Sequence, residues 1–211
     1  MSRLRYNRQQ AVQHLQNNCP RLGQFISEHG SFKLKVASDA SLFEALARAI
    51  VYQQLSGQVA ATIHGRFCAL FGNDQPCPAD LTTMSFEQLR AVGLSRNKVL
   101  AIQDLAERSL RGHLPGSRQL AAMNDAAVIE KLCEVRGIGP WTAQMLLMFN
   151  LGRPDVMPST DLGVQKGVQA IYRMRALPDP TQVLQSTRHL APYRSAASWY
   201  FWRAADTVLM T

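Results

Sequence analysis

The segment Gly137-Ile138-Gly139-Pro140 constrains the fold of this chain more than any other feature. Two glycines permit positive φ and a close backbone approach, and proline suits the first position of a helix. The pattern therefore predicts two helices joined by a hairpin, with the free N–H groups and positive dipole of the second helix facing outward. Such a helix start holds an anion such as a DNA phosphate. A purely structural helix–turn–helix without a ligand is the alternative.

Helical periodicity recurs along nearly the whole chain, and no segment reads as a strand. A capping box at Ser85 and Gln88 and a capping side chain at Asn124 mark two helix starts. The last helix is expected to follow Pro192 and to carry Trp199, Trp202 and Val208, and an earlier one to open near Ser38-Asp39. We predict an all-α fold of about ten helices in two lobes.

The composition favours a soluble protein with a polyanionic partner. The 211 residues are 46% hydrophobic and 18% charged, with a net charge of +8. This balance favours nucleic acid, although many basic proteins have no such partner. The chain begins with a polar, basic segment, and its longest apolar run, residues 145–149, is far shorter than the roughly 20 residues that span a bilayer. We expect an intracellular protein, in cytoplasm, nucleoid or nucleus, with no membrane partner.

The four cysteines do not follow a metal-binding pattern. Cys19, Cys68, Cys77 and Cys133 form no CxxC pair, and no histidine stands at zinc-ligand spacing from them. An iron–sulfur cluster would need four closely spaced cysteines. Reduced thiols are therefore expected, with neither zinc nor an iron–sulfur cluster.

Several motifs together resemble one family of DNA repair enzymes. The segment Glu134-Val-Arg-Gly-Ile-Gly-Pro-Trp-Thr-Ala-Gln144 resembles the hairpin of the helix-hairpin-helix (HhH-GPD) DNA glycosylase superfamily. Residues 153–161, Arg-Pro-Asp-Val-Met-Pro-Ser-Thr-Asp, resemble its Gly/Pro loop and terminal aspartate, and residues 43–56, 92–98 and 192–202 also match. The similarity covers roughly residues 35–209 and is greatest to the AlkA-type 3-methyladenine DNA glycosylases. It implies one glycosylase domain over residues 1–211, with the hairpin at about 125–150 and no extra N-terminal domain.

The resemblance assigns the catalytic role to Asp161. An ionised carboxylate near C1′ stabilises the positive charge that develops on the sugar when the N-glycosidic bond breaks, and it can also activate water. An aspartate before a helix is otherwise often only an N-cap. Lyase-active relatives place a nucleophilic lysine in the hairpin where this chain has Trp141. The resemblance therefore implies a monofunctional glycosylase that uses water and needs no cofactor for the chemistry.

Recognition of a damaged base requires that the base be flipped out of the duplex. An aromatic pocket favours a cationic alkylated purine, and Trp141 and Trp202 match pocket positions of the family. Tyr52 is a weaker candidate, for which a place in the core is the favoured alternative, and Met145 stands where some relatives have an aromatic residue. The wedge that fills the gap in the stack is expected within residues 53–55, where Gln54 aligns with the intercalating leucine of longer relatives and Gln53 and Leu55 flank it.

The remaining contacts expected from the resemblance concern the DNA backbone and a cation. Candidate phosphate contacts are Gly137, Gly139, Thr142, Arg96 and Lys98, although the last two could simply lie on a solvated face. Relatives bind Na⁺ or K⁺ through hairpin carbonyls, which here would be those of Cys133, Val135 and Ile138.

These motifs imply a protein acting on double-stranded DNA that contains alkylated bases such as 3-methyladenine and 7-methylguanine, and we expect it to act as a monomer. A non-catalytic damaged-DNA-binding module and a glycosylase/lyase for oxidised bases are the alternatives.

Overall fold

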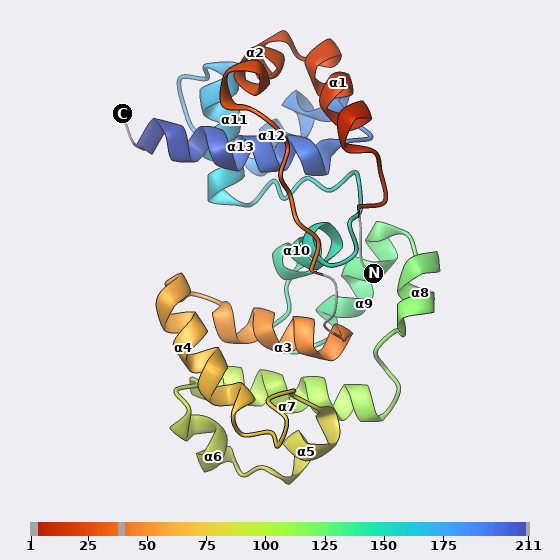
Figure 1. Cartoon of the computed structure of the whole chain (residues 1–211), viewed down its shortest axis with the longest axis vertical. Helices are drawn as coiled ribbons and strands as arrows, with labels where there is room; N and C mark the ends of the chain where they lie inside the picture. Colours follow the sequence, from red (N-terminus) through yellow and green to blue (C-terminus); the bar gives the residue numbers. More distant parts are fainter. Residues whose placement is uncertain (1–3, 38–40, 210–211) are drawn as a thin grey trace. The chain divides into compact units, whose positions relative to one another are not determined.

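The computed structural model describes residues 4–37 and 41–209, and this part of the chain is helical without any strand (Figure 1). It forms thirteen α-helices and one 3-10 helix. The elements are α1 (Arg8–Asn18), α2 (Pro20–His29), α3 (Leu42–Tyr52), α4 (Gly57–Cys68), α5 (Pro78–Thr83), α6 (Phe86–Ala91), α7 (Arg96–Leu110), α8 (Ser117–Ala122), α9 (Asp125–Cys133), α10 (Pro140–Phe149), α11 (Leu162–Tyr172), α12 (Pro180–Ser186), η1 (Arg188–Leu190) and α13 (Arg194–Leu209).

The chain divides into two compact units, and the predicted all-α fold with two lobes is confirmed. The terminal unit comprises residues 1–38 and 147–211, and the hairpin unit comprises residues 39–146. The boundary falls within α10. The described residues form thirteen α-helices where about ten were predicted, and α5, α8 and α12 among them have only six or seven residues. Such short helices give too few turns to show a periodic pattern.

The terminal unit is built on the contact between α11 and α13, the largest helix–helix contact in the chain. Gly167 of α11 faces the backbone of α13 so closely that a Cβ atom there would lie 1.9 Å from the carbonyl oxygen of Phe201. The apolar side chains of Val168, Tyr200 and Phe201 are fully buried beside this crossing. Close packing of the two backbones thus fixes the position of the helix that follows Asp161.

In the hairpin unit, α7 is the helix on which α3, α5 and α6 pack. Ile102 and Leu105 of α7 are fully buried, as are Leu46 and Ile50 of α3. This packing places the C-terminal end of α3 and the start of α7 beside each other, and both contribute to the site described below.

Local capping explains where several helices begin. The predicted capping box of Ser85 and Gln88 starts α6, and the Asn124 side chain accepts from the N–H of Ala127 at the start of α9. The helix expected near Ser38-Asp39 begins instead at Leu42, because Ser41 and Glu44 form a capping box of their own. Ser38 and Asp39 lie outside the described residues, as does the side chain of Val208.

We expect Gly167→Ala to lower the free energy of unfolding by about 3 kcal/mol, because the new methyl group can be accommodated only if α11 and α13 move apart. Thermal and urea denaturation would measure the change. Gly65→Ala is the matched control, since Gly65 is also helical but a Cβ there meets nothing within 4 Å. This control should gain up to about 1 kcal/mol from helix propensity. Equal stability of the two variants would contradict the close-packing argument.

Candidate active site

Asp161 is the N-cap residue of α11, and its carboxylate is held by two donors. Its Oδ1 accepts a hydrogen bond from the backbone N–H of Val164 at 2.9 Å and another from the indole Nε1 of Trp202 at 2.8 Å. The side chain is half-buried. The alternative of a helix cap is therefore correct as local structure, but it does not exclude catalysis. Two donors on one oxygen fix the orientation of the carboxylate.

Trp202 reaches Asp161 because α13 crosses α11 at two glycines. A Cβ atom on Gly163 would lie 2.8 Å from Cδ1 of Trp202 and 3.1 Å from Oδ1 of Asp161, so only glycine leaves room for this hydrogen bond. The indole ring stacks on Phe149, with ring centroids 5.8 Å apart and an interplanar angle of 26°. The structure thus brings together the predicted catalytic carboxylate and one predicted pocket tryptophan in the terminal unit.

The loop that carries Asp161 is fixed to the start of α13. Arg194 binds Asp155 through Nε–Oδ1 and NH2–Oδ2 contacts of 2.7 Å each, and its backbone N–H also donates to this carboxylate at 3.2 Å. Ser195 Oγ donates to the carbonyl of Arg153 at 2.7 Å and accepts from the N–H of Val156 at 3.0 Å. Burial raises the pKa of Asp155, but the hydrogen bonds and charge of Arg194 outweigh it and hold this pKa below its ordinary value.

The predicted hairpin is present between α9 and α10. Gly137 has φ +77°, a conformation that favours glycine, and a Cβ there would lie 3.2 Å from the Cβ of Ala101. Ile138 is buried, and the N–H of Arg136 donates to Oδ2 of Asp104 in α7 at 2.8 Å. A Cβ on Gly139 meets nothing within 4 Å, so the backbone there is open to a ligand. The start of α10 at Pro140 follows directly, as predicted.

The connection between α3 and α4 is tied to this hairpin. Gln53 Nε2 donates to the carbonyl of Gly137 at 2.9 Å and lies 3.5 Å from Oγ1 of Thr142. Gln54, the next residue, adopts φ +56°, which is uncommon for a residue other than glycine. Gln54 and Leu55 are exposed, whereas Gln53 is half-buried. Of the three wedge candidates, the geometry gives Gln53 a positioning role and presents Gln54 and Leu55 to the exterior.

Lys98 also binds the connection between α3 and α4. Its Nζ donates to the carbonyls of Val51 and Gln53, at 2.8 Å each, and so caps the end of α3. Burial lowers the pKa of this ammonium group. Lys98 was predicted to contact phosphate or to lie on a solvated face, and this capping role is neither of the two. Arg96, at the first position of α7, is exposed and stays a candidate phosphate contact.

The other predicted pocket residues lie in the hairpin unit. Trp141, in the first turn of α10, is 42% exposed, which is unusual for so large an apolar side chain. Met145 is half-buried on the same helix. The guanidinium of Arg48 lies 4.2 Å from the ring centroid of Tyr52, and His64 makes an edge contact with this ring. These contacts favour a structural role for Tyr52, and its place in a base pocket stays a prediction.

The hairpin's predicted phosphate and cation contacts are of backbone type. Thr142 is only 6% exposed, so its N–H in the first turn of α10 is a better candidate than its hydroxyl. The Val135 carbonyl accepts from the N–H of Ile138 at 3.0 Å and keeps a second lone pair that suits a cation. The expected cation site at Cys133, Val135 and Ile138 stays a prediction.

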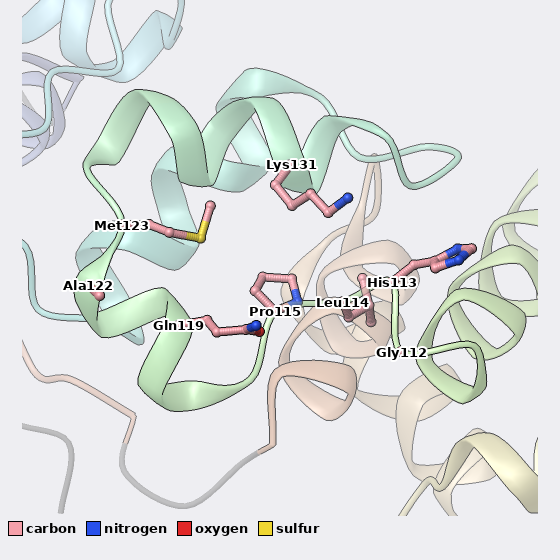
Figure 2. A pocket seen from close by; sticks show the side chains of 8 residues that line it. All are labelled: Gly112, His113, Leu114, Pro115, Gln119, Ala122, Met123 and Lys131. Carbon is pink, nitrogen blue, oxygen red and sulfur yellow. The ribbon is translucent and has the colours of Figure 1, made fainter.

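Three further findings concern metal binding, membrane insertion and a cavity. The four cysteines are unpaired, and within residues 4–37 and 41–209 no three or more His, Cys, Asp or Glu side chains are grouped as metal ligands. No helix in the same residues is long and apolar enough to cross a membrane. A cavity of about 560 Å³ lies in the hairpin unit, and none of the predicted site residues lines it. Figure 2 shows the residues that do line it: Gly112, His113, Leu114, Pro115, Gln119, Ala122, Met123 and Lys131.

Sequence reasoning missed the residues that position the site. The pair Gly163 and Gly167, one helical turn apart on α11, was a readable sign of a close helix crossing. The Asp155–Arg194 pair joins residues 39 positions apart and had no local signal. Phe149, which stacks on Trp202, was visible only as part of an apolar run.

Comparison with known proteins places this geometry in a family. A model described as "HhH-GPD superfamily base excision DNA repair protein" matches residues 47–192. DNA-3-methyladenine glycosylase 1 of Schizosaccharomyces pombe is 37% identical over 77% of this chain and 72% of its own length. A putative DNA-3-methyladenine glycosylase of Bacillus subtilis is 31% identical over 88% of this chain and 66% of its own length.

Solved structures agree with the sequence comparison. The S. pombe 3-methyladenine DNA glycosylase in complex with abasic DNA superposes with a TM-score of 0.84 at 33% identity, covering 92% of this chain and 95% of that one. A DNA-3-methyladenine glycosidase from Bacillus halodurans gives a TM-score of 0.85 at 35% identity, covering 95% and 91%. The family model, the relatives and the solved structures agree with the hairpin and the aspartate loop described above. The chain therefore belongs to the HhH-GPD superfamily of base excision DNA repair proteins.

Proposed function

We propose that this protein is a monofunctional DNA glycosylase that hydrolytically removes alkylated purines, such as 3-methyladenine and 7-methylguanine, from double-stranded DNA. The observation that carries the proposal is the Asp161 carboxylate, fixed by Trp202 Nε1 and the Val164 N–H at the end of the Gly/Pro loop. The names of the relatives support the substrate class, and the S. pombe structure with abasic DNA supports the reaction product. The protein would act as a monomer inside the cell.

In the proposed mechanism, Asp161 acts on the sugar rather than on the base. Cleavage of the N-glycosidic bond leaves positive charge on C1′ and O4′, and a carboxylate held in one orientation stabilises this charge without reorganising. The same carboxylate can orient or deprotonate the attacking water. Alkylation at N3 or N7 makes the departing base cationic, so the base leaves without needing a strong acid.

The aromatic side chains supply the preference for a cationic base. Trp202 is half-buried and stacks on Phe149, and Trp141 offers an exposed indole in the first turn of α10. Indole faces attract cations more strongly than other aromatic rings do. The hairpin holds the DNA backbone through N–H groups at Gly139 and the start of α10, and a Na⁺ or K⁺ ion on the Val135 carbonyl would stiffen it. No cofactor takes part in the chemistry.

The residue most directly tested is Asp161. We expect Asp161→Asn to lower single-turnover release of 3-methyladenine and 7-methylguanine from methylated DNA by about 10²- to 10³-fold, the usual cost of losing one charge-stabilising group. Binding to abasic DNA should be retained. Asp206→Asn, an exposed substitution on α13, is the control and should release bases at the wild-type rate. If wild type bound abasic DNA tightly but released no base, the protein would be a non-catalytic damage-binding module.

A second expectation separates hydrolysis from lyase chemistry. A lyase forms a Schiff base between a lysine and C1′, which borohydride reduces to a stable covalent complex. Because Trp141 stands where lyase-active relatives have lysine, wild-type protein should give no trapped complex with methylated or abasic DNA. Denaturing electrophoresis would show this, with a known glycosylase/lyase on an oxidised substrate as the positive control. A trapped band that survives Asp161→Asn would assign the protein to the lyase class.

The wedge can be identified by comparing duplex and single-stranded substrates. A residue that fills the gap left by a flipped base matters only when that base must leave a stack, and taking the base out of the stack costs a few kcal/mol. We expect Gln54→Ala to slow base release from duplex DNA about tenfold while release from single-stranded DNA is unchanged. Leu55→Ala, at the neighbouring exposed position, is the comparison. A larger duplex-specific loss for Leu55→Ala would assign the wedge to Leu55 instead.

A further inference from the structure

The net charge of the protein is divided unequally between its two units. The terminal unit carries thirteen Lys and Arg against five Asp and Glu, whereas the hairpin unit carries ten of each. The entire net charge of +8 therefore belongs to the terminal unit, and the unit that contains the phosphate-binding hairpin is neutral. Long-range attraction of DNA scales with net charge, so it must originate mainly in the terminal unit.

Several basic side chains of the hairpin unit are paired within that unit. Arg108 contacts Asp104 at 3.0 Å and Glu134 at 3.6 Å, and Lys131 contacts Glu134 at 3.0 Å. These pairs neutralise charge that would otherwise face a polyanion. The hairpin itself binds phosphate through N–H dipoles, which need no net charge.

The acidic residues of the terminal unit are largely engaged elsewhere. Asp155 binds Arg194, Asp161 binds Trp202, and Asp179 caps α12. Asp155 and Asp179 are thus engaged within the unit, and the excess of basic over acidic residues leaves positive charge available to an external anion.

Lys33 and Lys35 are displayed by an ordered, extended segment. Residues 30–37 run without regular secondary structure from the end of α2, as the orange stretch in Figure 1 shows. Phe32 and Leu34 are buried, and Lys33 and Lys35 between and after them are exposed. Arg8 fixes the backbone, because its NH1 donates to the Phe32 carbonyl at 3.0 Å and its NH2 to the Leu34 carbonyl at 2.7 Å. The two lysines therefore share one outward face.

The spacing of the two ammonium groups and their lack of partners within the described residues suit binding to a phosphate backbone. Two residues of extended chain span about 6.6 Å, so the long side chains can reach neighbouring phosphates of one strand. Within residues 4–37 and 41–209, neither lysine has an ion-pair or hydrogen-bond partner. Binding DNA would therefore break no existing interaction.

We propose that Lys33 and Lys35 form a sequence-independent binding surface for the phosphate backbone of duplex DNA, additional to the hairpin. The choice of DNA as the polyanion rests on the proposed function. The surface contributes salt-dependent attraction, and the hairpin contributes orientation.

The test is the salt dependence of binding to an undamaged 25-base-pair duplex, measured by fluorescence anisotropy between 50 and 200 mM KCl. Each phosphate contact contributes about 0.9 to the slope of log K against log salt. Lys33→Gln/Lys35→Gln should therefore reduce the magnitude of the slope by about 1.8 and weaken binding about tenfold at 100 mM. Lys33→Arg/Lys35→Arg should keep the wild-type slope.

Two double variants serve as matched controls. Arg66→Gln/Arg118→Gln removes two exposed charges from the hairpin unit and should leave the slope unchanged. Arg173→Gln/Arg175→Gln removes two exposed charges from another part of the terminal unit. A reduction of about 1.8 in this variant, with none in the lysine variant, would overturn the assignment to residues 33 and 35.

The remaining outcomes distinguish this proposal from the proposed function. Wild-type release of methylated purines with identical slopes for all variants would overturn the lysine surface and leave the glycosylase intact. No base release by wild type, with the expected loss of slope in the lysine variant, would overturn the glycosylase and support the surface. Tighter binding and a larger loss with an RNA duplex of the same sequence would overturn DNA as the partner.

Discussion

The close crossing of α11 and α13 is the constraint on which the candidate site depends. Gly163 and Gly167 lie one turn apart on α11 and remove the side chains that would separate the helices. Their absence of a Cβ lets Trp202 reach the carboxylate of Asp161 at 2.8 Å. The proposed catalytic carboxylate is thereby positioned by the packing of two helix backbones, which deform less readily than a loop.

The loop before Asp161 adds a second level of fixation. Asp155, Ser195 and Ser198 tie residues 153–157 to the first turns of α13, the same helix that carries Trp202. The loop before Asp161 and the tryptophan that binds its carboxylate are therefore both fixed to the same helix, α13. A carboxylate that is oriented before substrate arrives loses little energy to reorganisation when charge develops on the sugar, which is the main requirement for electrostatic catalysis.

The sequence predicted the features that depend on neighbouring residues and missed those that depend on distant ones. The hairpin glycines, the Asn124 cap and the capping box at Ser85 follow from short-range backbone chemistry, and the structure contains all three. The role of Lys98 could not be read in this way, because its partners at Val51 and Gln53 lie more than forty positions away. A lysine in a basic protein looks the same whether it caps a helix or meets solvent.

The unequal distribution of charge explains how two demands on a DNA repair protein can be met separately. Searching DNA requires attraction that is strong but indifferent to position, and mobile counterions make it sensitive to salt. Acting on one nucleotide requires orientation, which N–H groups at a helix start supply with little dependence on net charge. Because the hairpin unit is neutral and the terminal unit carries the whole excess of +8, the proposed division of roles would let substitutions in the terminal unit alter the search without changing phosphate binding at the hairpin. A uniformly basic surface would couple attraction to orientation, since every change in the attraction to DNA would also change phosphate binding at the hairpin.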